Sequence, residues 1–122
     1  MAKTVLVVED SAFIGDAIRN ILEPHDIFVL QEDDGNKVLD LVKSKGVDLV
    51  ILDLMMPKLP GRDVLERLKN DPQTKSLPVI ILSARIDHAR WDPEIQACDK
   101  FIAKPFKNED LIESVKKLLK KK

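Results

Sequence analysis

Short hydrophobic runs alternate with longer amphipathic segments along this chain. A run of four or five mostly apolar residues between polar or turn-forming residues is typical of a parallel strand covered on both faces. Such runs predict strands at Thr4–Val8, Ile27–Leu30, Leu49–Leu52, Pro78–Leu82 and Lys100–Ala103. The segments between them repeat hydrophobic residues at helical spacing.

Capping and turn residues predict where the helices begin and end. Ser11 is a suitable N-cap for the first helix, and Pro24 stops that helix. Further helices are expected after Asp34-Gly35 and after Pro60-Gly61. The last helix has the most regular apolar face, formed by Leu111, Ile112, Val115, Leu118 and Leu119.

Five strands, each followed by a helical segment, predict an α/β fold with right-handed crossovers. We expect a flavodoxin-like doubly wound (βα)5 domain over residues 1–122, with a parallel sheet of order 2-1-3-4-5 and helices on both faces. In such sheets ligands bind beyond the carboxyl ends of the strands, where the strand order reverses. That point lies between the first and third strands.

Polar residues directly follow four of the predicted strands. They are Glu9, Asp10, Asp53, Ser83 and Lys104. Any one of them alone is explained as a helix cap or turn residue. Because the carboxyl ends of parallel strands meet at one edge of a sheet, we expect all of these side chains to converge there. The complementary chemistry of the set indicates a functional site.

The electrostatics of this set point to a metal-assisted phosphoryl transfer. Two carboxylates 4–5 Å apart repel by roughly 3–4 kcal/mol at an effective dielectric constant near 20. Therefore one carboxylate is protonated or a cation is bound. Oxygen ligands with room for water suit Mg²⁺. With Lys104 and Ser83 nearby, Asp53 is placed to act as a nucleophile toward a phosphoryl group.

The chain resembles response-regulator receiver domains over essentially its whole length. Four blocks carry the resemblance in the family's order: VVED (Val7–Asp10), DLMMP (Asp53–Pro57) followed by Gly61, LSA (Leu82–Ala84) and KPF (Lys104–Phe106). The resemblance implies that Asp53 accepts a phosphoryl group from a histidine kinase or a histidine phosphotransfer protein. It also implies a phosphoacceptor that assists its own phosphorylation and dephosphorylation and is not an enzyme.

The resemblance further implies a role for each site residue. Mg²⁺ would be ligated directly by Asp10 and through water by Glu9. Asp53 and the backbone carbonyl of Met55 would complete the protein ligands. Ser83 and Lys104 would hold the phosphoryl oxygens, and the Lys104–Pro105 peptide bond is expected to be cis.

A conformational switch is also implied. Ser83 would move to bond the phosphoryl group, and Phe101 would follow as the switch aromatic. The face formed by the fourth helix, the fifth strand and the last helix would then signal to a downstream protein. In the alternative interpretation, Phe101 is ordinary core at all times. The exposed edge of the first helix near Ser11–Gly15, with Pro105-Phe106, is the expected kinase-docking surface.

The segment Ile86–Ala97 departs most from the family pattern. Its residues allow a helix, but Pro93 limits that helix to a short or late one. Ala97 stands where the family usually has glycine, which removes an easy left-handed helix end. We therefore expect the fourth helix to end differently or to be partly unwound. Trp91 is either an anchor for a partner or packed on its own helix.

Three other functions compete with this interpretation. An aspartate-nucleophile phosphohydrolase typically needs a second aspartate two residues after the first, where this chain has Met55. A flavin- or nucleotide-binding flavodoxin-like protein needs a Gly- or Ser/Thr-rich loop after the first strand, where Glu9 and Asp10 stand. A degenerate receiver would act only as a binding module.

Composition narrows the remaining classes. The 122 residues are 44% hydrophobic and 34% charged, as is usual for one globular domain. A net charge of -1 argues against a general nucleic-acid or anionic-membrane surface, and Lys116–Lys122 finishes a solvated helix. No apolar run approaches the roughly 20 residues of a transmembrane helix. The single Cys98 excludes an internal disulfide. We expect a cytoplasmic protein.

Overall fold

The computed structural model describes residues 2–54, 56, 58–84 and 98–120, and it confirms the predicted parallel sheet. The strands are β1 (Lys3–Val8), β2 (Ile27–Glu32), β3 (Leu49–Asp53), β4 (Val79–Ser83) and β5 (Lys100–Ala103). They lie in the order β2-β1-β3-β4-β5, and every neighbouring pair is parallel. Each strand starts and ends within two residues of its predicted bounds.

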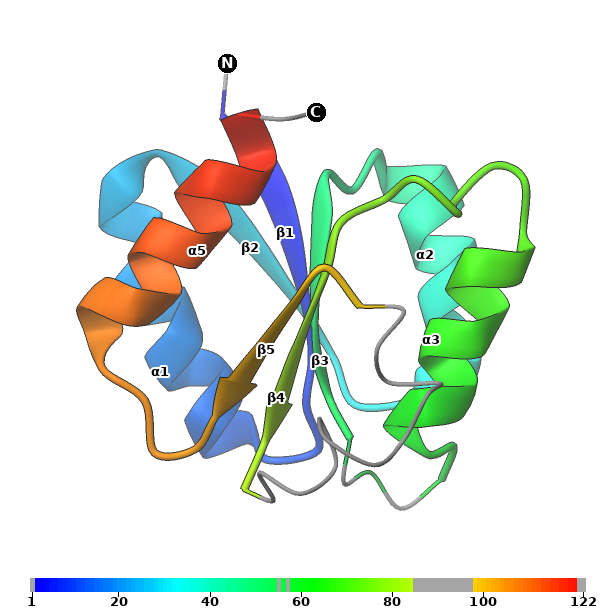
Figure 1. Ribbon diagram of the computed structural model, residues 1–122, viewed down its shortest axis with the longest axis horizontal. Coiled ribbons are helices and arrows are strands. Elements are labelled where there is room, and N and C mark those ends of the chain that lie inside the picture. Colours follow the sequence, from blue (N-terminus) through cyan, green and yellow to red (C-terminus); the bar gives the residue numbers. More distant parts are fainter. Residues whose placement is uncertain (1, 55, 57, 85–97, 121–122) are drawn as a thin grey trace.

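Helices cover both faces of the sheet, as predicted. They are α1 (Ala12–Leu22), α2 (Val38–Lys45), α3 (Gly61–Asn70) and α5 (Asn108–Lys120). Helices α1 and α5 lie on one face, and α2 and α3 lie on the other (Figure 1). The predicted helical segment at 86–97, with the expectations for Trp91, Pro93 and Ala97, lies outside the described residues.

Capping and turn residues set the helix ends, among them Ser11 as expected. The Ser11 hydroxyl accepts a hydrogen bond of 3.3 Å from the Ile14 amide and caps α1. After α1, Pro24 lies in a 3-10 turn that leads to β2. Helix α2 ends at Gly46, whose φ of 63° is a left-handed conformation that glycine adopts without a side-chain clash.

The hydrophobic core has two halves, one on each face of the sheet. All residues of β3 and β4 are buried, which explains why their sequences are continuous apolar runs. Alternate side chains point to opposite faces, so Leu49 and Ile51 pack with α1 and α5, whereas Val50 and Leu52 pack with α2 and α3. By the same alternation, Asp53 leaves the end of β3 on the side of α1 and α5.

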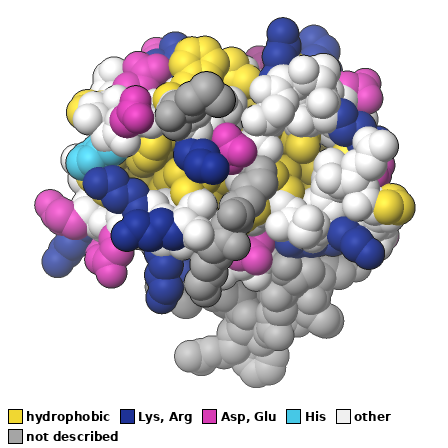
Figure 2. Space-filling model, turned by 90° about the horizontal axis from the view of Figure 1, so that it is seen from above, with side chains coloured by type: hydrophobic (Ala, Val, Ile, Leu, Met, Phe, Trp, Pro, Cys, Tyr) yellow, Lys and Arg dark blue, Asp and Glu magenta, His cyan; other side chains and the backbone are white. Residues whose placement is uncertain are grey.

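Acidic and basic side chains are interspersed over the surface that Figure 2 shows, which lies at the amino ends of the strands. This distribution fits the near-neutral net charge of the chain. Among the described residues, no helix is long and apolar enough to cross a membrane.

Candidate functional site

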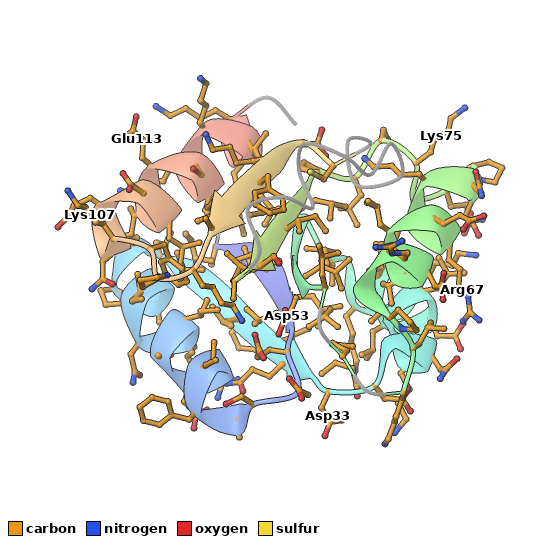
Figure 3. All side chains as sticks on the ribbon, turned by 60° about the horizontal axis from the view of Figure 1, so that its bottom comes forward. Asp33, Asp53, Arg67, Lys75, Lys107 and Glu113 are labelled. Atoms are coloured by element: carbon orange, nitrogen blue, oxygen red, sulfur yellow. The ribbon has the colours of Figure 1, made fainter. Side chains whose placement is uncertain are left out.

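The carboxyl ends of β1, β3, β4 and β5 lie at one edge of the sheet, and they carry the predicted site residues. The register pairs Val8 with Leu52, Asp53 with Leu82, and Ser83 with Ala103. Consequently the residues that follow these strands come together. Figure 3 brings this edge forward and shows Asp53 near its centre.

Three carboxylates form the core of the site. One oxygen from each of Glu9, Asp10 and Asp53 lies within 4.8 Å of the others. Glu9 and Asp53 are only 6% and 4% exposed, whereas Asp10 is open to solvent. Two buried carboxylates at this spacing need a compensating positive charge, and an all-oxygen set with one solvent-facing member fits Mg²⁺. Met55, whose backbone carbonyl was predicted as a further ligand, lies outside the described residues.

Lys104 supplies a positive charge to the buried pair. Its ammonium donates hydrogen bonds of 3.3 Å to Glu9 Oε2 and of 3.3 Å to Asp53 Oδ2. The Lys104 side chain is 20% exposed, so both ion pairs are largely shielded from water. The Lys104–Pro105 peptide bond is cis, as the sequence led us to expect. The lysine therefore bridges the first and third strands from the end of the fifth.

Burial and the neighbouring charges change the pKa of Glu9. Its pKa is raised from 4.5 to about 7, chiefly by burial and then by the hydrogen bond to Asp53 and the negative charge of Asp53. The charge of Lys104 and the hydrogen bond from the Ser11 amide, which is 3.3 Å from Glu9 Oε1, act in the opposite direction. Burial and crowding thus favour a protonated Glu9 below about pH 7, and protonation is one of the two outcomes predicted for three crowded carboxylates.

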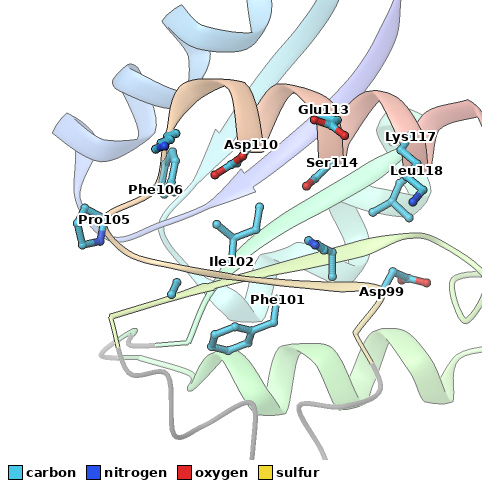
Figure 4. A pocket seen from close by; sticks show the side chains of 13 residues that line it. Asp99, Phe101, Ile102, Pro105, Phe106, Asp110, Glu113, Ser114, Lys117 and Leu118 are labelled. Atoms are coloured by element: carbon cyan, nitrogen blue, oxygen red, sulfur yellow. The ribbon is translucent and has the colours of Figure 1, made fainter.

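The two remaining site residues lie on β4 and β5. Ser83 is fully buried at the end of β4, and its carbonyl accepts a 2.8 Å hydrogen bond from the Lys104 amide. Phe101 is half-buried and packs against the half of the core that contains α2 and α3. In Figure 4 its ring lies on the opposite side of β5 from Ile102. The movement predicted for Ser83 and Phe101 stays a prediction.

Gly61 supports the backbone of Asp53, a role that the sequence did not reveal. Its amide donates a 3.1 Å hydrogen bond to the Leu54 carbonyl. A Cβ atom at Gly61 would come within 2.6 Å of the Leu54 Cα, where no side chain fits. The start of α3 therefore packs directly on the end of β3. The only sequence signal was the Pro60-Gly61 turn and its place in the family motif.

The fold and this acidic edge match a known family. The family model for the response regulator receiver domain matches residues 5–116. The chain therefore belongs to the response regulator receiver domain family of two-component systems. Domains of this family are signalling phosphoacceptors that bind Mg²⁺ at an acidic pocket, and the carboxylate cluster fits that description.

Curated relatives agree with this assignment. The response regulator MprA of Mycolicibacterium vanbaalenii is 32% identical, over 99% of this chain and 52% of that protein. The phosphate regulon transcriptional regulatory protein PhoB of Escherichia coli is 28% identical, over 99% of this chain and 53% of that protein. The chain thus spans about half the length of these relatives.

Solved structures confirm the flavodoxin-like architecture. The response regulator TrrA of Thermotoga maritima, solved in complex with Mg²⁺-BeF, is 32% identical with a TM-score of 0.86, and the match covers 95% of this chain and 98% of that one. The receiver domain of the Francisella response regulator 1452 is also 32% identical with a TM-score of 0.86, and it covers 98% of both chains.

Proposed function

We propose that residues 1–122 form one receiver domain that accepts a phosphoryl group on Asp53 in a Mg²⁺-dependent reaction. The donor is a histidine kinase or a histidine phosphotransfer protein, and the site lies in the cytoplasm, where such donors present their phosphohistidine. The single observation that carries this proposal is the buried Asp53 carboxylate, which shares the Lys104 ammonium with Glu9 and has an oxygen within 4.8 Å of carboxylate oxygens of Glu9 and Asp10.

In the proposed reaction, an Asp53 carboxylate oxygen attacks the phosphorus of the donor phosphohistidine. The P–N bond breaks as the P–O bond forms, and its electron pair returns to the imidazole, which takes a proton from solvent. Mg²⁺, held by Glu9, Asp10, Asp53 and the Met55 carbonyl, would supply charge neutralisation at the transferred group. Lys104 lies close enough to Asp53 to shift from the two carboxylates to the phosphoryl oxygens. The Ser83 hydroxyl would donate a hydrogen bond to another phosphoryl oxygen.

We propose that phosphorylation then changes a surface. The phosphoryl group adds nearly two negative charges and three strong acceptors next to the end of β4. Movement of Ser83 would leave space under that strand end, and Phe101, which is half-buried, would turn inward to fill it. The face formed by the fourth helix, β5 and α5 would carry this change to a downstream protein. No direct contact with nucleic acid or membrane is part of this mechanism.

The proposed docking surface for the phosphodonor lies beside the site. Phe13, near the start of α1, is 83% exposed, which is unusual for a large apolar side chain. Pro105 is exposed and Phe106 is half-buried at the start of the loop between β5 and α5. A phosphohistidine presented over these residues would approach the carboxyl ends of the strands, where Asp53 lies.

Incubation with Mg²⁺ and beryllofluoride or acetyl phosphate tests this function. We expect a stoichiometric adduct that Asp53→Asn abolishes and that Asp63→Asn, a carboxylate in the first turn of α3, leaves intact. Continuous release of phosphate from acetyl phosphate without an accumulating adduct would instead favour the phosphohydrolase. The absence of any response in the wild-type protein would favour a degenerate receiver that acts only by binding.

A further inference from the structure

Strand β5 leads directly to Lys104, but few side chains of this strand are buried against the rest of the protein. It is a four-residue strand at the edge of the sheet and pairs with β4. Among its residues only Ile102 is buried. Register is specified strongly where one face of a strand is buried, and β5 buries only one of its four side chains. Other contacts must therefore fix the register of β5 on β4.

Asp99, the residue before β5, makes such contacts with the start of β4. Its amide donates a 2.9 Å hydrogen bond to the Val79 carbonyl. Its carboxylate Oδ2 accepts a 2.8 Å hydrogen bond from the Val79 amide. Val79 is fully buried, so its amide has no access to water and depends on this carboxylate. One aspartate thus engages both backbone groups of a single buried residue.

Lys69, near the end of α3, holds the Asp99 carboxylate from the other side. Its ammonium lies 3.3 Å from Asp99 Oδ2. The same ammonium donates to the carbonyls of Lys75, at 3.4 Å, and of Leu77, at 3.3 Å, in the loop before β4. The Lys69 side chain is 20% exposed. Lys69 and Asp99 together therefore join the end of α3 to the starts of β4 and β5, and we call this pair the basal clamp.

We propose that Asp99, held by Lys69, is a positioning residue that fixes the register of β5 and thereby the reach of Lys104 into the site. Lys104 follows Asp99 by five residues, or about 16 Å of extended strand. Figure 4 shows Asp99 at one end of β5 and Pro105 beyond the other. A slip of one residue would turn every side chain of the strand to the opposite face. The basal clamp would oppose that slip at the amino end of β5, which is the end farther from the carboxylate site.

The binding of two ligands, Mg²⁺ and beryllofluoride, distinguishes a positioning role of the basal clamp from a purely stabilising one. The carboxylates that bind Mg²⁺ follow β1 and β3, which are paired to each other and not to β5. Beryllofluoride, as a phosphoryl analogue, additionally needs the Lys104 ammonium. Loss of the basal clamp should therefore weaken beryllofluoride binding while Mg²⁺ affinity stays the same or rises. This first readout rests on the proposed function.

The test compares Asp99→Ala, Asp99→Asn and Lys69→Met with Lys43→Met in the full chain. Lys43 forms a 2.7 Å ion pair with Asp71 that joins α2 to the loop after α3, so it is a matched control at the same end of the sheet. Titration calorimetry gives Mg²⁺ affinity and, at saturating Mg²⁺, beryllofluoride affinity. We expect Asp99→Ala to weaken beryllofluoride binding by about tenfold or more, which is the loss expected when one hydrogen bond to a charged group is weakened. Asp99→Asn keeps an acceptor for the Val79 amide and should lose less.

Hydrogen exchange in the free protein gives a second readout that needs no phosphoryl chemistry. The Lys104 amide, which donates to the Ser83 carbonyl, should exchange faster in Asp99→Ala and Lys69→Met than in Lys43→Met. Equal losses of Mg²⁺ and beryllofluoride affinity, or unchanged beryllofluoride binding and unchanged exchange, would overturn the proposal. If the wild-type protein forms no adduct, the proposed function fails, and the exchange rates alone decide whether the basal clamp positions Lys104.

Discussion

Lys104 Nζ lies 3.3 Å from Asp53 Oδ2, so the proposed phosphoacceptor is paired with a lysine from a strand two positions away in the sheet. The same ammonium also lies 3.3 Å from Glu9. A divalent ion that binds these carboxylates competes with the lysine for the same oxygens. In the proposed mechanism, Mg²⁺ binding would free the ammonium from these oxygens so that it can pair with the phosphoryl group. We therefore expect Lys104 to pair with carboxylates in the metal-free site and with the phosphoryl group after phosphorylation.

Replacement of Lys104 should separate metal binding from phosphoryl transfer. We expect Lys104→Met to slow phosphorylation by acetyl phosphate by about a hundredfold or more, which is the cost of removing one preorganised donor to developing negative charge. Mg²⁺ affinity should not fall, because a competing cation has been removed from two of the carboxylates. A time course by intact-protein mass spectrometry measures the rate. Lys107→Met, an exposed lysine three residues later, is the matched control and should behave as wild type.

Mg²⁺ affinity should depend on pH through Glu9. Its pKa is raised to about 7, chiefly by burial, so below pH 7 a proton occupies the carboxylate that the metal needs. Mg²⁺ affinity should therefore rise with pH, by at most about tenfold per unit for one displaced proton, and level off above pH 7. Calorimetric titrations between pH 5.5 and about 8.5 measure this. A pH-independent affinity in the wild-type protein would contradict the assignment.

Protonation of Glu9 should also change the free energy of unfolding of the metal-free protein. A carboxyl group whose folded pKa lies above its unfolded pKa stabilises the fold at low pH, and that stabilisation is lost as pH rises through the folded pKa. For Glu9 the window runs from 4.5 to about 7. The difference in free energy of unfolding between the wild type and Glu9→Gln should therefore change across this window and stay constant above it. Urea titrations at several pH values provide the measurement.

The fold was predictable from the sequence largely because β3 and β4 are buried on both faces and therefore have continuous apolar sequences. The Lys100–Ala103 strand was bounded correctly by its own short apolar run, even though only Ile102 is buried there. Ser11 capped its helix as expected because a hydroxyl at that position satisfies a free helix amide wherever the helix packs. Such features depend on local chemistry and on the alternation of side chains along a strand, and both can be read from the amino-acid sequence.

The grouping of the site carboxylates was also predictable, since residues after parallel strands share one edge. The contacts made by individual groups were not. Nothing in the sequence indicates that Lys104 bridges Glu9 and Asp53, because that depends on how far the ammonium reaches across the sheet. Likewise, the hydrogen bonds of Asp99 to Val79 and to Lys69 span 20 and 30 residues. Contacts between residues so far apart in the sequence leave no local sequence pattern, so they are found only in the folded structure.

Gly61 should tolerate no side chain without disturbing Asp53, the proposed phosphoacceptor. In Gly61→Ala the new Cβ would lie within 2.6 Å of the Leu54 backbone, so Asp53 and Leu54 must shift. We expect a loss of about 1–3 kcal/mol in the free energy of unfolding, as for other overpacked sites, together with weaker beryllofluoride binding. Gly46→Ala is the control, because Gly46 has a φ of 63° and no atoms within 4 Å of its Cβ position. That variant should lose stability through backbone strain alone and bind beryllofluoride normally.

The switch proposed for Phe101 can be followed with fluorinated phenylalanine. The chain has four phenylalanines, and Phe28, which is 53% exposed on the distant edge strand β2, serves as the internal reference. On addition of Mg²⁺ and beryllofluoride, the fluorine resonance of Phe101 should move to a new position while that of Phe28 stays in place. Phe101→Leu identifies the resonance and should leave the rate of phosphorylation by acetyl phosphate unchanged, because Phe101 touches none of the reacting atoms in the proposed mechanism. An unchanged Phe101 signal in a protein that does bind beryllofluoride would show that this ring is fixed core, and the surface change would then have to start from Ser83 by another route.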